Sequence, residues 1–327
     1  MLQTLKNAWR TKDIRSKLLF TLLILLLYRI GTVIPVPFVD AHDFAGSFSG
    51  TILDYLNLLS GGSLGQATLF ALGVSPYINS SIIIQLLAVV FPKLGELGKT
   101  DKKKMNLITR LVTVGLAIVT ALGYYFLLRN GSGTVETFLT HRAFEGKMAW
   151  FYGIVIVVCY TAGASLVMWL AEKINENGIG NGISIILFAG IVARLPVTVG
   201  QLWSFFTYAL AYPAEQWPFF IFVPLFVVLF LIVIWVIVFM QDAERRIPVQ
   251  YAKRVVGRRM YGGQSTHIPV KVAMSGVMPV IFASSILSIP STIQLFTGTP
   301  TEGFWAGFFN AFAPNGWLYM VLYFLLI

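Results

Sequence analysis

Residues 217–240 read WPFFIFVPLFVVLFLIVIWVIVFM, an apolar run without a charged side chain. At about 1.5 Å per residue, a helix of this length crosses a hydrocarbon core of about 30 Å. The pattern therefore predicts a membrane-spanning helix. Further apolar runs lie at residues 18–35, 69–91, 106–128, 148–171, 183–200 and 270–291. Together they predict an all-α polytopic membrane protein with seven complete spans.

Composition excludes the main alternative. The chain is 57% hydrophobic and only 12% charged, whereas about a quarter of a soluble domain is charged. Too few polar side chains remain to coat a globule, which excludes a water-soluble enzyme. The run at residues 18–35 ends without a small-residue cleavage site, so we expect a retained helix and no cleaved signal peptide.

Residues that could carry chemistry are scarce. Cys159 is the single cysteine and lies in an apolar run, so we expect it to pack and predict no disulfide framework. The three histidines lie far apart in loops and give little support to a metal site. Residues 95–100 resemble the end of a phosphate-binding loop, but Lys93 occupies the position of its first glycine. We predict no enzyme activity and no cofactor.

Basic residues set the orientation in the membrane. Lys and Arg gather at the N-terminus and after the second and sixth spans, whereas residues 36–68, 201–216 and 294–316 contain neither. Alternating spans place the three basic loops on one side, which the positive-inside rule assigns to the cytoplasm. Only residues 129–147 weaken the contrast. We expect a cytoplasmic N-terminus and attraction of the basic loops to anionic lipids.

The loop at residues 241–271 is more basic than topology requires. It carries the pairs Arg245–Arg246 and Arg258–Arg259, with Tyr251 and Tyr261 nearby. A basic loop with aromatic residues suits docking to RNA phosphates or to an acidic protein surface. A plain topology signal is the alternative.

Several spans contain irregular sequence. Residues 73–81 combine glycine, proline and polar residues, and the preceding residues 58–65 are moderately apolar but interrupted by glycines. Such backbone is tolerated at membrane depth where it lines a cavity or is buried in protein. A re-entrant segment followed by a broken helix is one interpretation, and a packed helix kink is the other. The small residues at 177–184 and 274–285 indicate either close packing or a hinge.

Charges inside the spans are few. Arg29, Arg110 and Arg194 lie near span ends, where snorkelling explains them. No acidic residue lies deep in a predicted span, although ion-coupled transporters usually mark their pathway with such groups.

The last apolar run starts near Trp317 and stops at Ile327, which is too short to cross a membrane. We therefore expect the sequence to be a piece of a longer protein. A true end at this position would instead indicate a non-functional fragment.

Six stretches resemble the SecY family, the large subunits of the bacterial protein-conducting channel. They are RIGTVIPVP at 29–37, ALGVSPYI at 71–78, SIIIQLL at 81–87, ENGIGNGISII at 176–186, YAKR at 251–254 and QSTH at 264–267. The resemblance runs in order along nearly the whole chain.

This resemblance implies a clamshell of ten helices, of which seven and part of the eighth are present. The N-terminal half would be residues 1–200, with helices 1–5 and a plug at about 56–67. The incomplete C-terminal half would be residues 201–327, with a docking loop at 241–271. The family implies translocation of unfolded preproteins across the bacterial cytoplasmic membrane and lateral release of transmembrane segments into lipid.

The resemblance also implies functional residues and partners. The pore ring would comprise Val74, Ile78, Ile183, Leu187 and Ile281. The plug would include Leu58, Ser60, Gly61, Gly62, Ser63, Leu64 and Gly65. The lateral gate would include Asn79, Ser80, Ser81, Gln85, Ser284 and Ser285. Docking would use Lys253, Arg254, Arg258 and Arg259. The implied partners are SecE, SecG, SecA, the ribosome, and preprotein or nascent-chain substrates.

Two rival functions are consistent with broken helices and a basic loop. A secondary transporter also contains pseudo-repeats and interrupted spans, but it usually needs the deep carboxylates that are missing here. A membrane receptor or scaffold would use the basic loop only to dock a partner.

Overall fold

The computed structural model describes most of the chain. The described residues are 9–40, 57, 60–130, 137–140, 148–211, 213–249, 254–256, 259–261, 266–272, 279–280, 282–284, 286–287, 290, 293, 304–313 and 316–327. They form two compact units, Met1–Leu195 with Phe282–Ile327, and Pro196–Ile281.

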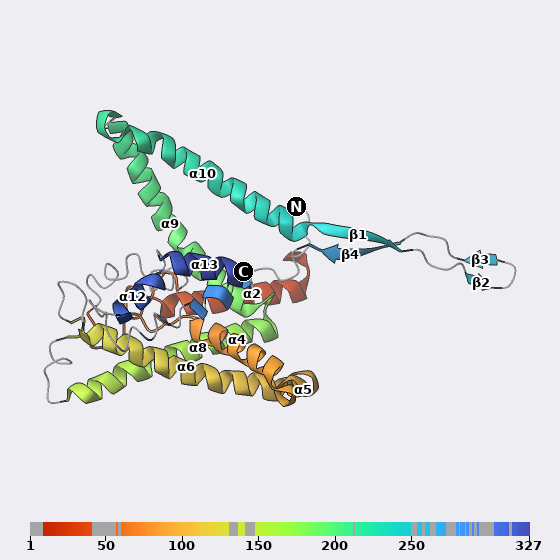
Figure 1. The fold of residues 1–327 in the computed structure, drawn as a ribbon, viewed down its shortest axis with the longest axis horizontal. Helices are drawn as coiled ribbons and strands as arrows, with labels where there is room; N and C mark the ends of the chain where they lie inside the picture. The colour runs from red at the N-terminus through yellow and green to blue at the C-terminus, as the bar shows by residue number, and fades with distance from the viewer. Residues whose placement is uncertain are drawn as a thin grey trace. The chain divides into compact units, whose positions relative to one another are not determined.

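Helices build the first unit (Figure 1). They are α2 (Lys12–Gly31), α4 (Ser75–Val90), α5 (Pro92–Thr100), α6 (Lys102–Asn130), α8 (Ala149–Asn177), the first half of α9 (Gly182–Ala211), α12 (Phe304–Ala311) and α13 (Trp317–Leu326). Helices α6 and α8 lie side by side, α4 packs on α6, and α2 packs on α8. Ala117, Ala121 and Ala164 are buried in the core that includes α6 and α8, where small residues let helices approach closely.

Helix α4 ends abruptly and is followed by α5 at an angle of 115°. Pro92 is the first residue of α5, and the preceding Phe91 is extended. Proline lacks an amide hydrogen and disfavours helical backbone in the residue before it, so the helix stops at Val90. Pro76 lies in the first turn of α4 and starts the helix. The break predicted around residues 73–81 therefore lies at Phe91–Pro92.

Four described helices are long and apolar enough to cross a membrane, and α4 with α5 makes a possible fifth. Helix α2 is not among these four, and its 20 residues include Arg15, Lys17 and Arg29 near its ends. It also ends at Gly31, earlier than the predicted 35. The predicted span at 270–291 lies partly outside the described residues, and the ten-residue α13 is short, as expected.

The complete spans are longer than their apolar runs. Helices α6 and α8 have 29 residues each, and α9 and α10 have 30 each. At about 1.5 Å per residue such helices exceed a hydrocarbon core of about 30 Å. Apolar sequence marks only the part in the core, so the helix ends were missed.

Extended backbone after α2 ties two loops together. The Val36 amide donates to the Ala67 carbonyl at 3.0 Å, and the Asp40 amide donates to the Phe138 carbonyl at 2.8 Å. These bonds give the carbonyl groups of the buried Ala67 and Phe138 a hydrogen-bond partner, although neither residue lies in a helix or a strand.

The second unit contains the rest of α9, α10 (Pro213–Asp242) and a hairpin (Figure 1). Strand β1 (Glu244–Val249) pairs antiparallel with β4 (Thr266–Lys271), and β2 (Arg254–Val256) pairs with β3 (Arg259–Tyr261). In the register of β1 and β4, Ile247 lies opposite Ile268 and Glu244 lies opposite Lys271. The strands were not predicted, because this segment was interpreted only as a basic loop.

Candidate functional site

Three of the predicted pore-ring residues meet in one apolar cluster. Val74 is buried there, and Ile78 and Ile183 pack against it from α4 and α9. The cluster also contains residues of α2 and α8, so four helices converge on it. Leu187 is half-buried on α9, and Ile281 lies outside the described residues.

The predicted plug falls on a run of turns, which we call the turn cluster (residues 60–68). Leu58 lies outside the described residues, whereas Ser60, Ser63 and Leu64 are buried. Gly61 and Gly62 have φ values of +71° and +90°, which favour glycine because a side chain would be strained there. Gly65 is also buried.

Hydrogen bonds connect the turn cluster to Asn57 and residues within the cluster to each other. The Gly65 amide donates to Asn57 Oδ1 at 2.9 Å, and the Gly62 amide donates to the Asn57 carbonyl at 2.8 Å. Ser63 Oγ donates to the Ser60 carbonyl at 2.8 Å. The buried backbone thus has partners although it forms no helix. Asn57 was not among the predicted site residues. Its position just before the glycines was the one feature of the sequence that could have indicated its role as an acceptor for the turn cluster.

The predicted gate residues on α4 point to different surroundings. Ser80 is fully buried, and its Oγ donates to the Thr109 carbonyl of α6 at 2.8 Å. Ser81 and Asn79 are half-buried, and Gln85 is exposed and donates through Nε2 to Ser81 Oγ at 3.3 Å. Ser284 is half-buried, and Ser285 lies outside the described residues.

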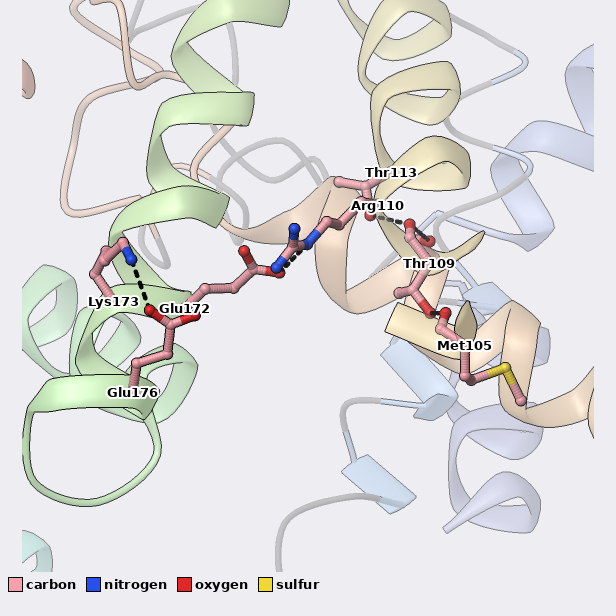
Figure 2. Close-up of polar contacts among 8 residues, drawn as sticks. Met105, Thr109, Arg110, Thr113, Glu172, Lys173 and Glu176 are labelled. Atoms are coloured by element: carbon pink, nitrogen blue, oxygen red, sulfur yellow. Dashed lines mark hydrogen bonds and ion pairs between the residues drawn. The ribbon is translucent and has the colours of Figure 1, made fainter. Parts of the chain in front are cut away.

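Beside the contact between Ser80 and Thr109, α6 and α8 are joined by an ion pair (Figure 2). Arg110 Nε donates to Glu172 Oε1 at 2.7 Å, with 48% and 18% of the two side chains exposed. Thr113 Oγ1 donates to the same Thr109 carbonyl that Ser80 uses, at 2.7 Å. Arg110 was predicted to snorkel. Helix α8 extends beyond its apolar run, which brings Glu172 within reach.

The turn between α5 and α6 is also fixed by a charge pair. Asp101 accepts from the Lys104 amide at 3.4 Å and pairs with Lys104 Nζ at 3.3 Å. The hydrogen bond from Lys104 lowers the pKa of the exposed Asp101 carboxyl below its usual value. An acidic residue at this position stabilises the start of α6.

The two faces of the hairpin formed by β1 and β4 carry different side chains. Ile247, Ile268 and Val249 share one face with Arg245, since directly opposite residues project to the same side. Arg246, His267 and Lys271 occupy the other face and are exposed. Of the predicted docking residues, Arg254 lies in β2 and Arg259 in β3. Lys253 and Arg258 lie outside the described residues.

Among the residues that the structure describes, no group of three or more His, Cys, Asp or Glu side chains could hold a metal ion. Cys159 is half-buried in α8. In the first unit, the described residues assemble an apolar cluster between helices and a buried turn cluster.

Known proteins share this arrangement. The family model SecY matches residues 68–327. Protein translocase subunit SecY of Streptomyces coelicolor is 42% identical over 346 residues, covering 100% of this chain and 75% of the relative. A solved SecY structure, whose plug domain is described as stabilising the closed translocation channel and maintaining a membrane seal, matches with a TM-score of 0.58 at 21% identity. That match covers 90% of this chain and 61% of the other.

A second solved structure is Sec61 in a canine ribosome–channel complex from the endoplasmic reticulum. It matches with a TM-score of 0.51 at 20% identity, covering 90% of this chain and 62% of that chain. The chain thus spans about three quarters of its curated relative and about three fifths of the solved channels.

The described residues have the fold of a multi-pass helical membrane protein, in which Pro92 separates α4 from α5. This confirms the predicted all-α membrane architecture, with the hairpin added. The chain belongs to the SecY family.

Proposed function

We propose that this chain is the central subunit of a Sec protein-conducting channel in the bacterial cytoplasmic membrane. The observation that carries the proposal is 42% identity along its whole length to a relative named as a protein translocase subunit. The channel would move unfolded preproteins across the membrane and would itself catalyse no reaction. The N-terminus would face the cytoplasm, as the basic loops indicate.

The pore ring would form from Val74, Ile78, Ile183, Leu187 and Ile281. The convergence of the first three on one cluster between helices supports this assignment. Flexible aliphatic side chains can adapt to a moving peptide without binding any residue tightly. Their apolar constriction would also resist water and ions.

The turn cluster would act as the plug that closes the resting pore. Its burial, its internal hydrogen bonds and its bonds to Asn57 support a compact unit that would move as one piece. The halves of the clamshell would meet near residue 200.

The lateral gate would run along α4, with Ser81 and Gln85 on one side of the helix and Asn79 on the other side of the buried Ser80. Ser284 and Ser285 would face them across the opening. Ser80 supports the gate differently, since its bond to Thr109 holds α4 against α6. Parting polar side chains that water can hydrate costs less than separating a close-packed apolar surface.

The hairpin would dock SecA or the ribosome through Lys253, Arg254, Arg258 and Arg259. Exposed Arg246 and Lys271 on the charged face support docking to an acidic surface or to RNA phosphates. SecE and SecG would complete the membrane complex, and anionic lipids would contact the basic loops.

A photo-crosslinker tests the channel directly. A crosslinking amino acid at Ile78, in the complete complex, should capture an arrested secretory chain during translocation. The same probe at Val119, which is 47% exposed on α6, is the matched control and should capture lipid or neighbouring subunits only. Equal capture at both positions, or ion-coupled solute uptake without capture, would favour the transporter instead.

A further inference from the structure

Arg194 lies near the middle of a membrane helix. The sequence predicted that Arg194 lies near the end of a span at 183–200, where snorkelling explains a charged side chain. Helix α9 instead continues to Ala211, so Arg194 lies twelve residues after Gly182 and seventeen before the last residue. A charged side chain within a membrane-spanning helix usually faces protein or a water-filled cavity.

The Arg194 side chain lies against the turn cluster. A Cβ atom added to Gly62 would be 3.0 Å from both Nε and Nη2 of Arg194. One helical turn earlier on α9, a Cβ added to Gly61 would be 2.8 Å from the carbonyl oxygen of Gly190. Two consecutive glycines therefore lie against two positions that share one face of α9.

This close approach depends on glycine at both positions. Gly61 and Gly62 have left-handed φ values, and a side chain at Gly62 would displace the guanidinium. The guanidinium carries five donors and no acceptor, and turn backbone offers carbonyl oxygens. The chemistry of the two groups is complementary: a cation that donates hydrogen bonds lies against two consecutive glycines, whose backbone carries no side chain.

We propose that Arg194 is a positioning residue that holds the turn cluster against α9 in the resting channel. The inference rests on the proposed function, since the turn cluster acts as a plug only in a channel. Release of the plug then requires the guanidinium to leave the Gly62 backbone. Arg194 sets how tightly the resting channel stays closed.

Cysteine labelling tests this contact in membranes that contain the complete complex, with Cys159→Ala as background. Ser63→Cys replaces a buried residue of the turn cluster by one of similar size. A water-soluble maleimide should label it slowly when Arg194 is present. Arg194→Ala should raise the labelling rate roughly tenfold, because it removes a charged group that lies against Gly62. Arg194→Lys should restore most of the protection.

Two further cysteines separate positioning from general loss of structure. Gln66→Cys is exposed and should react equally fast in both backgrounds. Ala121→Cys lies in the core of the first unit and should stay protected in both. Equal acceleration at Ala121→Cys, or no acceleration at Ser63→Cys, would overturn the proposal. Labelling is read without substrate, so a protein that labels as expected but transports nothing contradicts the proposed function alone.

Discussion

Helices α8 and α10 are nearly equal in length and both strongly apolar, yet they are used differently. Ten residues of α8 are buried, including Gly153, Gly163 and Ala164, whereas no residue from 218 to 242 in α10 is buried. Helix α8 mixes small and polar residues with large ones. Helix α10 has large apolar residues on every side. Hydropathy identifies both as spans, and the small residues of α8 indicate where it packs against neighbouring helices of its own unit.

The largest effect is expected at the closest contact of α8. A Cβ on Gly163 would overlap the carbonyl oxygen of Leu69, so Gly163→Ala forces backbone apart. We expect a loss of about 3 kcal/mol of unfolding free energy, the upper end for overpacking. Thermal denaturation of the purified protein in detergent would measure it.

Gly115→Ala provides the matched control on α6. A Cβ there meets nothing within 4 Å, so the substitution should stabilise by up to about 1 kcal/mol through helix propensity. If both alanine variants were equally stable, the contact between α8 and Leu69 would not be close.

A pair of leucines tests the comparison itself. Leu170 in α8 is 5% exposed, and Leu229 in α10 is 55% exposed. Leu170→Ala should cost about 2 kcal/mol, because lipid removes the solvent-transfer part of the penalty and leaves the cavity part. Leu229→Ala should change the same unfolding free energy by less than about 0.5 kcal/mol. Equal costs would indicate that α10 packs as tightly as α8.

The ion pair between α6 and α8 should contribute less. Arg110→Ala and Glu172→Ala should each cost about 1 kcal/mol, since the arginine is half-exposed and solvent screens the pair. The double variant should cost little more than either single one. A double-mutant cycle on the melting curves would reveal the coupling, and simple additivity would show that the pair contributes nothing.

The smallest effect is expected for the contact between α4 and α6. Ser80→Ala removes one donor from the Thr109 carbonyl, which keeps the bond from Thr113, so the cost should be about 0.5 kcal/mol. Ser81→Ala should have no measurable effect on the melting temperature. A larger effect at Ser81 than at Ser80 would reverse the assignment of the two hydroxyls.

Apolar runs predicted the four membrane-spanning helices among the described residues, but not the ends of these helices. The run at 217–240 appears as a helix from Pro213 to Asp242, because hydropathy stops at the edge of the hydrocarbon and the helix does not. Proline was a better guide to the broken span than composition. Pro76 lies at the start of α4, where proline is tolerated. Pro92 lies just after the end of α4, and the chain turns there before α5 begins.

Contacts across helices were harder to predict. Arg110 and Glu172 are 62 residues apart, and nothing in either local sequence indicates the other. The hairpin was missed because its strands are short, charged and interrupted by proline. The one available signal was the repeated Ile-Pro-Val, at 247–249 and 268–270, whose isoleucines lie opposite each other in the sheet.

Those two prolines bear on how an exposed two-stranded hairpin avoids self-association. Every strand of a two-stranded sheet is an edge, and an edge with free amide hydrogens invites another strand to pair with it. Pro248 in β1 and Pro269 in β4 each remove one such donor, one from each strand. Each strand is a poorer template for a neighbouring copy, so many such proteins can crowd one membrane without their hairpins joining into a continuous sheet.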